Sequence, residues 1–169
     1  MVISISCFFA YAQVPEKSEQ KLENAEVSIK FYDRTVYYPG DSENNPVYVY
    51  ITVSNKGSST LRFKIADDKM FSVDFIAFNV KKMQLPSTQG LIRKRTTNQT
   101  VYFREISLEP GEEYSFRENL KDYLEIKDPS IYYVELRFYP ELYRNKNISL
   151  TSNRLSLEVR PSPSAASSS

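Results

Sequence analysis

The side chains that most often carry enzyme chemistry are scarce in this chain of 169 residues, which has no histidine and one cysteine, Cys7. Histidine is the usual general base and the commonest ligand of transition metals, and a cysteine thiolate is the usual sulfur nucleophile. Carboxylates, lysines and tyrosines are what remains for catalysis.

The acidic clusters do not have the arrangement that catalysis needs. Three glutamates surround a Pro-Gly turn, with no apolar neighbours that would raise a carboxyl pKa: Glu109, Glu112 and Glu113. A second cluster offers the oxygen ligands that calcium prefers, but it matches no twelve-residue calcium loop: Asp41, Glu43, Asn44 and Asn45. Asp67-Asp68 has fewer ligands still. Solvated turns are the better interpretation, and we expect no metal, no cofactor and no enzyme activity.

Two basic clusters flank one segment of the chain: Lys81 and Lys82, and Arg93, Lys94 and Arg95. If this segment folds back on itself, five cations share an edge that suits an anionic glycan, a cell-wall polymer or an acidic protein surface. The alternative is that these residues discourage edge-to-edge pairing of an apolar strand. No aromatic residues are interleaved in these clusters and the net charge is +1, so nucleic acid is not an expected partner.

Tyrosine is abundant, with 13 copies, and four tyrosines fall at outward positions of the expected strands: Tyr48, Tyr50, Tyr133 and Tyr139. Tyrosine is enriched where proteins bind proteins, so these side chains are candidates for an interaction surface. The alternative is cross-strand packing alone.

Strong alternation of apolar and polar residues at 47–53 and 132–138 predicts the strands that must position these side chains. Weaker alternation recurs at 27–31, 61–65, 114–116 and 155–159. A chain of this length forms about one domain. The pattern predicts an all-β, antiparallel β-sandwich of about seven to nine strands over residues 25–160, and the resemblance described next implies that it is Ig-like.

The entry to the strand at 132–138 resembles a motif of immunoglobulin-like sandwiches. Asp128, Ser130, Tyr132 and Val134 are spaced like the tyrosine corner, in which a tyrosine hydroxyl bonds to upstream backbone. Val134 stands where antibody domains have their second cysteine, and the chain has no tryptophan. The resemblance is therefore to the architecture and not to antibody domains themselves.

A second resemblance spans roughly residues 46–138. A strand ending in Ser54-Asn55, followed later by Leu108-Glu109-Pro110-Gly111-Glu112 and a tyrosine strand, is similar to Ig-like domains related to the bacterial intracellular proteinase inhibitor (BsuPI-like) family. This resemblance implies a proteinase inhibitor that acts through an exposed loop, for which residues 84–98 are the candidate.

The middle of the chain is less regular. The run 71–80 is apolar on both faces and predicts a central strand or a second buried surface. Residues 84–98 contain Pro86, Gly90 and a Thr-rich basic stretch, so we expect an irregular segment with a short strand at Leu91-Ile92. The apolar residues change from one face of the strand to the other near Glu105, which predicts a kink there. Residues 120–126 predict a short amphipathic turn.

The first residues, 1–12, read as a truncated signal peptide that ends in Ala10-Tyr11-Ala12 and releases Gln13. Alternatives are a lipid anchor at Cys7, or a cytosolic protein with an unstructured start. Residues 13–24 are a polar leader and 161–169 a disordered tail or linker stub. Asn98 and Asn147 lie in glycosylation sequons, and no apolar run is long enough to span a membrane.

Together these features predict an exported, non-enzymatic Ig-like module in the periplasm or cell exterior. We expect it to bind a protein partner, whose identity the sequence does not give, through loops or an edge strand. Proteinase inhibition through residues 84–98 is the alternative function.

Overall fold

A computed structural model describes residues 22–34, 36–140 and 148–163 of the chain. Within them lie two α-helices, one 3-10 helix and ten strands. The helical elements are η1 (Lys69–Phe71), α1 (Gln89–Thr96) and α2 (Leu120–Tyr123). The strands are β1 (Ala25–Phe31), β2 (Val36–Tyr37), β3 (Tyr48–Asn55), β4 (Leu61–Ala66), β5 (Val73–Asn79), β6 (Phe103–Leu108), β7 (Glu113–Asn119), β8 (Ser130–Phe138), β9 (Leu150–Thr151) and β10 (Leu155–Val159).

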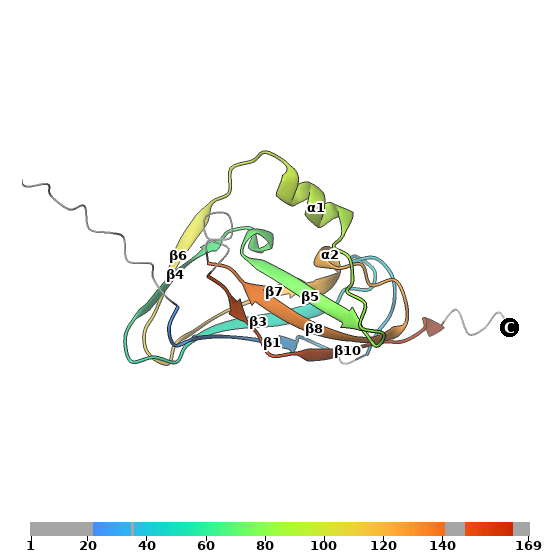
Figure 1. Ribbon diagram of the computed structural model, residues 1–169, viewed down its shortest axis with the longest axis horizontal. Coiled ribbons are helices and arrows are strands. Elements are labelled where there is room, and N and C mark those ends of the chain that lie inside the picture. The colour runs from blue at the N-terminus through green and yellow to red at the C-terminus, as the bar shows by residue number, and fades with distance from the viewer. Residues whose placement is uncertain (1–21, 35, 141–147, 164–169) are drawn as a thin grey trace, which may run out of the picture.

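Two sheets form the two layers of the fold, and Figure 1 shows them one behind the other. One sheet has the order β1-β3-β7, and the other has the order β2-β10-β8-β5 with β9 attached to β8. A separate two-stranded ribbon, β4-β6, extends from one end. All pairings are antiparallel except that of β10 with β2.

The predicted alternation forms the core between the two sheets. Val49, Ile51 and Val53 of β3 point inward and are fully buried. The facing strand β8 buries Tyr132, Val134, Leu136 and Phe138 in the same alternating way. Because each strand has one apolar face, stacking the two sheets removes both faces from water. The prediction of an all-β antiparallel sandwich is confirmed.

The predicted tyrosine corner is present at the start of β8. The Tyr132 hydroxyl donates a hydrogen bond of 2.6 Å to the backbone carbonyl of Asp128. Burial is the main cause that raises the pKa of Tyr132 above its usual value. The corner therefore ties the turn at Pro129 to the first buried position of the strand.

The prediction for residues 84–98 is wrong in its secondary structure. Residues 89–96 form the helix α1 where we expected an irregular segment with a short strand. The Thr88 hydroxyl caps the helix by accepting a bond from Leu91 N at 3.1 Å, and Leu91 is the one buried residue of the helix. A helix with a single buried residue shows almost no apolar periodicity, which is why the sequence pattern missed it.

Two expectations about strands also differ from the structure. β6 pairs with β4 residue for residue, so the expected kink near Glu105 is absent. Of the two predictions for the run 71–80, a central strand or a second buried surface, the first is wrong, because β5 ends the strand order of its sheet. The free side of β5 is covered instead by Leu85, whose N–H bonds to the Ala77 carbonyl at 2.9 Å.

One side chain joins the edge of the β1-β3-β7 sheet to the segment between β9 and β10. The Asn153 amide accepts a bond from Ile29 N at 2.8 Å and donates one to Ile29 O at 3.0 Å. The amide thus takes the place of a neighbouring strand at the centre of β1, and it closes part of this sheet edge.

Several sequence-based predictions fall on segments outside the described residues. These are the signal peptide with its alternative anchor at Cys7, residues 13–21 of the polar leader, the sequon at Asn147 and most of the C-terminal tail. Within the described part of the chain, no helix has the length and apolar character needed to cross a bilayer.

Candidate interaction surface

The outer face of the β1-β3-β7 sheet gathers tyrosines and cations. The strand register aligns Lys30, Tyr50 and Arg117 across the three strands, and Tyr48 lies two residues before Tyr50 on the same face. Tyr32 follows β1 and is held beside the sheet by a 3.0 Å bond from its N–H to the Tyr48 carbonyl. We call these five residues the cation–tyrosine face.

Arg117 lies over two aromatic rings of this face, Tyr32 and Tyr48, which meet edge to face. Its guanidinium carbon lies 4.8 Å from the ring centre of Tyr32 and 4.4 Å from that of Tyr48. Tyr32 also stacks on Tyr50 with ring centres 6.2 Å apart, and the Lys30 ammonium lies 5.4 Å from the Tyr50 ring. A cation over an aromatic face is attracted by the ring quadrupole, so these contacts hold the five side chains in one arrangement.

The charge of the cation–tyrosine face is not neutralised by its neighbours. Among the described residues, neither Lys30 nor Arg117 forms an ion pair with a carboxylate. Arg117 is exposed, and Tyr32 is 52% exposed. The rings fix the guanidinium without using its N–H donors, so these donors are available to carboxylates from outside.

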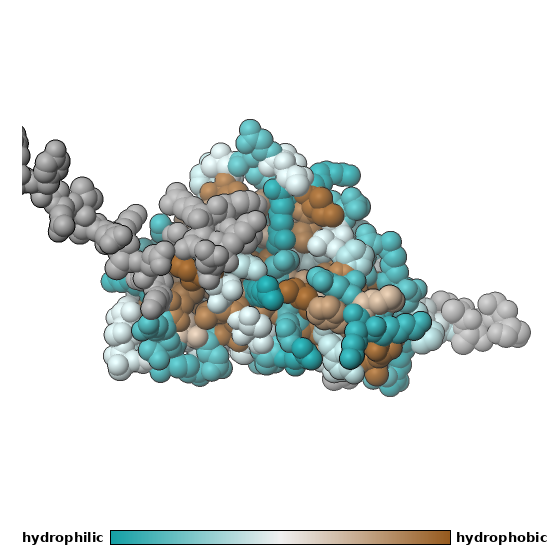
Figure 2. All heavy atoms as spheres, viewed as in Figure 1, coloured by the Kyte–Doolittle hydropathy of each residue, from teal (hydrophilic) through white to brown (hydrophobic). Residues whose placement is uncertain are grey.

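Tyr133 does not belong to this face, because it lies on the outer face of the other sheet. There it pairs across the strands with Phe78. Five exposed side chains form an apolar patch at this end of β5 and β8: Phe78, Val80, Met83, Ile131 and Tyr133. Figure 2 shows brown and tan spheres among teal ones over these strands. Lys81 and Lys82 are exposed in the turn that carries Val80 and Met83.

The two basic clusters lie at opposite ends of β5. Arg95 N–H groups bond to the carbonyls of Met70 at 2.9 Å and Val73 at 2.7 Å, at the start of this strand. Lys81 and Lys82 follow its last residue, and a seven-residue strand is about 20 Å long. The five cations therefore do not share one edge.

The remaining predicted site residues are partly engaged with other segments of the fold. Lys94 pairs with Asp68 at 2.5 Å, and Arg93 is exposed on α1. Tyr139 is half-buried, and its N–H donates to the Ser72 carbonyl at 2.7 Å. An interaction role for these residues, and for Tyr133, stays a prediction.

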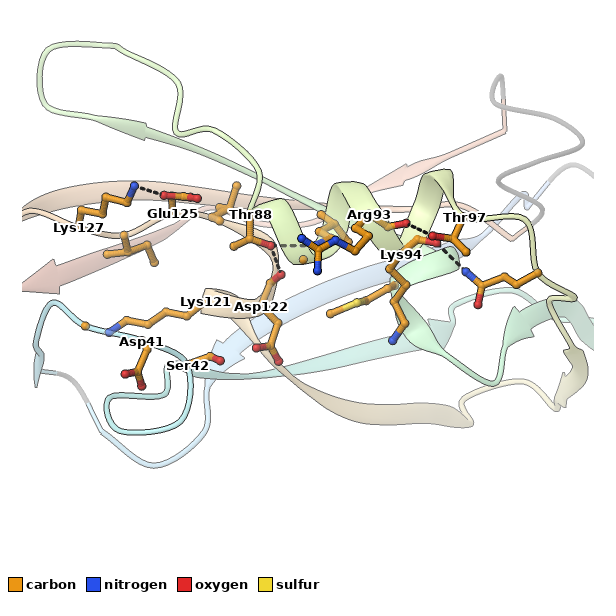
Figure 3. A pocket seen from close by; sticks show the side chains of 17 residues that line it. Asp41, Ser42, Thr88, Arg93, Lys94, Thr97, Lys121, Asp122, Glu125 and Lys127 are labelled. Atoms are coloured by element: carbon orange, nitrogen blue, oxygen red, sulfur yellow. Dashed lines mark hydrogen bonds and ion pairs between the residues drawn. The ribbon is translucent and has the colours of Figure 1, made fainter.

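A pocket of about 990 Å³ lies between α1, α2 and the loop at 40–42. Figure 3 shows Lys121 reaching from α2 toward the loop that carries Asp41 and Ser42. The Lys121 ammonium donates to the Tyr38 carbonyl at 2.6 Å. Burial lowers the pKa of Lys121 to about 8, although nearby Asp41 opposes the shift. The lysine thus fastens a loop to the core.

The acidic turn at 41–45 is built on Asp41. Its carboxylate accepts bonds from Glu43 N at 3.1 Å and Asn44 N at 2.8 Å, and it also accepts from the Asn44 amide. The Asn44 backbone bond is the largest cause that lowers the pKa of Asp41. These carboxylate oxygens hold the turn together, as Asp commonly does in loops.

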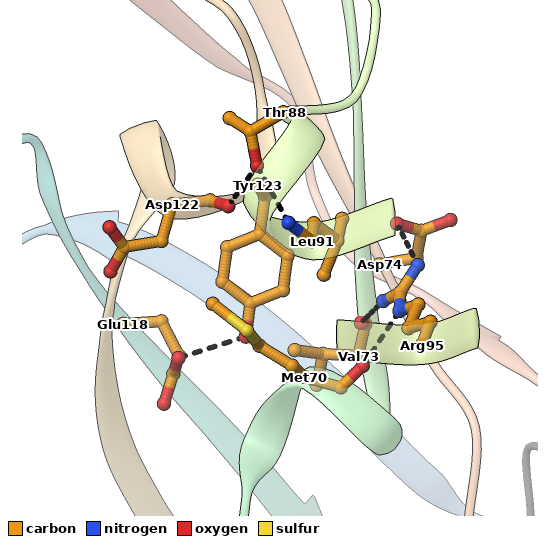
Figure 4. Close-up of polar contacts among 9 residues, drawn as sticks. All are labelled: Met70, Val73, Asp74, Thr88, Leu91, Arg95, Glu118, Asp122 and Tyr123. Atoms are coloured by element: carbon orange, nitrogen blue, oxygen red, sulfur yellow. Dashed lines mark hydrogen bonds and ion pairs between the residues drawn. The ribbon is translucent and has the colours of Figure 1, made fainter. Parts of the chain in front are cut away.

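Two part-buried hydrogen bonds hold α2, one to the residue that caps α1 and one to β7 (Figure 4). The Tyr123 hydroxyl donates to Glu118 at 2.8 Å, and the Thr88 hydroxyl donates to the Asp122 carbonyl at 2.6 Å. Burial raises the pKa of the Glu118 carboxyl. This carboxylate is the kind of perturbed group that can mark a catalytic site, but here it anchors the phenol of a core tyrosine.

Sequence reasoning missed three members of the cation–tyrosine face. Lys30 and Arg117 occupy outward positions of their strands, so strand parity contains the signal that would have found them. Tyr32 lies beyond the end of β1, where alternation gives no direction for a side chain. Its place over Arg117 comes from the tertiary structure.

Fold and surface together define an all-β sandwich domain that presents tyrosines and exposed cations on the outer face of one sheet. The family model for the N-terminal domain of flagellar collar protein C matches residues 26–160, and the chain belongs to this family. No curated protein matches the sequence.

Solved structures show only a distant likeness. A β-glucosidase from Listeria innocua matches with 12% identity and a TM-score of 0.38, covering 80% of this chain and 16% of the glucosidase. A Northeast Structural Genomics Consortium target matches with 12% identity and a TM-score of 0.40, covering 81% of this chain and 88% of the target. A β-glucuronidase from Bacteroides uniformis has 13% identity and a TM-score of 0.36, covering 78% and 12%. The chain thus spans about one sixth of the glucosidase that it resembles.

Proposed function

We propose that this domain is an exported, non-enzymatic interaction module that binds another protein chain in a flagellar collar. The family supplies the setting, since its members are N-terminal domains of flagellar collar protein C. The observation that carries the proposal is the contact of Arg117 with the rings of both Tyr32 and Tyr48 on an open sheet face.

The cation–tyrosine face suits an acidic protein surface. Tyrosine rings offer a large contact area and lose little conformational freedom on binding. Arg117 and Lys30 supply positive charge that no carboxylate of the described chain pairs with. Tyrosine and arginine are the residue types that dominate binding energy at protein interfaces. Complementary charge on the partner would speed association and fix its orientation.

The buried ionisable groups support a role without catalysis. Glu118 accepts a bond from Tyr123, and Lys121 donates to a backbone carbonyl. Both groups therefore act within the fold.

We further propose that the protein works in the periplasm or at the cell exterior. The support is the apolar start of the chain with its Ala10-Tyr11-Ala12 cleavage pattern. Fractionation of the native host followed by mass spectrometry tests this directly. A mature N-terminus at Gln13 in the envelope fraction is expected, and an intact Met1 in the cytosol would contradict export.

The binding proposal is tested by cross-linking in the native host, followed by recovery of the chain and identification of what is attached. We expect one reproducible partner from the flagellar collar. Tyr48→Ala and Arg117→Ala should each lower its recovery about tenfold, because each removes a central contact of the face.

Matched controls come from elsewhere on the molecule. Tyr133→Ala removes an exposed tyrosine from the opposite sheet, and Arg160→Ala removes an exposed arginine beyond β10. Both should leave recovery of this partner within about twofold. If all four variants recover the partner equally, the cation–tyrosine face is not its binding site.

The alternative function is proteinase inhibition through residues 84–98. Inhibition of this kind would present the helix α1 and its flanks to a protease. It predicts stoichiometric inhibition of at least one member of a protease panel, with the 84–98 segment left uncut. An interaction module of the collar should inhibit none of them.

A further inference from the structure

One edge of the two-stranded ribbon β4-β6 is formed by β6. Among the described residues, β6 pairs only with β4. Three consecutive residues at its start are exposed, and Tyr102 just before it is 69% exposed. In Figure 1, β6 lies at the left end of the molecule with β4 beside it.

The hydrogen-bonding pattern identifies which backbone groups lie on this edge. Asp67 N bonds to Tyr102 O at 2.9 Å, so positions 67 and 102 form a hydrogen-bonded pair. In an antiparallel ladder, hydrogen-bonded pairs alternate with pairs whose N–H and C=O groups point away from each other. The continuous register of the ribbon therefore turns the backbone groups of Phe103, Glu105 and Ser107 away from β4.

These outward groups have no partner within the described chain. No backbone or side-chain bond reaches the N–H or C=O of Phe103, Glu105 or Ser107 from outside the ribbon. The charged side chains of β6 are occupied on the β4 side, since Arg104 pairs with Asp67 at 3.2 Å and Glu105 pairs with Arg62 at 3.5 Å.

We propose that the edge of β6 receives an extended segment of a partner chain, which adds to the ribbon as a third strand. Only an extended backbone matches donors and acceptors that repeat at every second residue. The exposed rings of Tyr102 and Phe103 would contact an apolar side chain of that segment. The inference rests on the proposed role as an interaction module, but it uses no residue of the cation–tyrosine face.

A second copy of this chain fits the edge less well. When the β6 strands of two copies pair symmetrically, one register pairs all three outward residues. In that register Phe103 lies opposite Ser107 of the other copy, and Glu105 lies opposite Glu105. Like charges directly opposite each other destabilise a strand pair. We therefore assign the edge to a different chain.

The strand β7 also has an unpaired side, but it is more covered. All seven of its residues are exposed or half-buried, but only Glu113 and Arg117 are exposed, and the Lys69 ammonium lies 5.7 Å from the Phe116 ring. The 3.0 Å bond of Asn55 N to Glu112 O makes positions 55 and 112 a hydrogen-bonded pair of β3 and β7. Because such pairs alternate along the ladder, the N–H of Ser115 points away from β3. Ser115 therefore offers a matched control position.

The experiment compares three variants of the full chain in its native host. Glu105→Pro removes an outward N–H while proline remains compatible with an edge strand. Glu105→Gln keeps that N–H but removes the carboxylate, so it separates backbone from side-chain effects. Ser115→Pro removes an outward N–H on β7. Thermal unfolding of each purified variant verifies that it folds.

Cross-linked complexes are then recovered, and amide hydrogen exchange is measured in the complex and in the free chain. We expect Glu105→Pro to lower recovery of a partner at least tenfold relative to Glu105→Gln, and Ser115→Pro to stay within twofold of wild type. In the wild-type complex, the amides of Phe103, Glu105 and Ser107 should exchange at least tenfold more slowly than in the free chain.

Several results would overturn the inference: equal recovery by the two Glu105 variants, loss of the partner with Ser115→Pro alone, unchanged exchange of the three amides, or a second copy of this chain as the partner. A partner from outside the flagellum that still requires the Glu105 N–H would contradict the proposed function and support strand addition. Loss of a collar partner with Arg117→Ala but not with Glu105→Pro would support the proposed function and contradict strand addition.

Discussion

Tyr132 shows how one hydroxyl can fasten a turn to a strand. Tyr132→Phe removes only the 2.6 Å bond to the Asp128 carbonyl. The free energy of unfolding should fall by about 1 kcal/mol, the net worth of one such bond. Urea denaturation of the two proteins measures the difference. Tyr133→Phe is the control, because Tyr133 is 40% exposed, and it should change stability by less than about 0.5 kcal/mol. Equal effects of the two changes would argue against the corner.

Lys121 should make stability depend on pH above neutrality. Its folded pKa is about 8, below the 10.5 of an ordinary lysine. Between these values the unfolded chain binds more protons than the folded chain, so stability rises with pH. Below about pH 8 both forms are protonated, and the cost of burying the charge is fully present.

The comparison with Lys121→Met isolates this effect, because the tyrosines and other lysines titrate in both proteins. The unfolding free energy of wild type relative to the variant should increase by about 1–3 kcal/mol between pH 7.5 and 10.5. Denaturation curves at several pH values measure it. A difference that does not change with pH would mean that Lys121 keeps an ordinary pKa.

At the scale of elements, α1 depends on contacts outside itself. The helix has eight residues and buries only Leu91, and a helix this short is not stable alone. Arg95 holds it by bonds to the carbonyls of Met70 and Val73 and by an ion pair with Asp74 at 3.3 Å (Figure 4).

Arg95→Ala should therefore loosen α1 more than it destabilises the whole domain. We expect amides of residues 91–96 to exchange at least tenfold faster, with a loss of about 2 kcal/mol for the bonds to the guanidinium. Arg93→Ala, which removes an exposed cation from the same helix, should leave exchange nearly unchanged. Similar exchange in the two variants would show that Arg95 is not the anchor.

At the scale of the whole molecule, Phe63 lies where the ribbon meets both sheets. Its ring contacts Tyr114 of β7 with centres 6.3 Å apart and Phe138 of β8 with centres 5.5 Å apart. Phe63→Ala should lower the free energy of unfolding by about 3–5 kcal/mol and lower the denaturation midpoint in one cooperative transition. Phe78→Ala, at a position 36% exposed, should cost much less. Comparable losses would contradict this role for Phe63.

The predictions that succeeded concern features that are local in the sequence. Alternation along 47–53 and 132–138 determines which side chains can face a core, because neighbouring residues of a strand point to opposite sides. The tyrosine corner joins residues four positions apart, so its spacing is visible in the sequence. The sandwich class follows from these patterns, since half-apolar strands must stack to bury their faces.

The tertiary structure alone decided what these strands bring together. Arg117 and Tyr32 meet because β3 lies between β1 and β7, and strand order does not follow from periodicity. Tyr133 and the tyrosines of β3 carry the same outward signal but lie on different sheets. Lys121 is buried by a loop 83 residues earlier in the chain. The physical reason is the same in each case: alternation determines the facing of each residue within its own strand, while neighbours across strands depend on long-range packing of the whole chain.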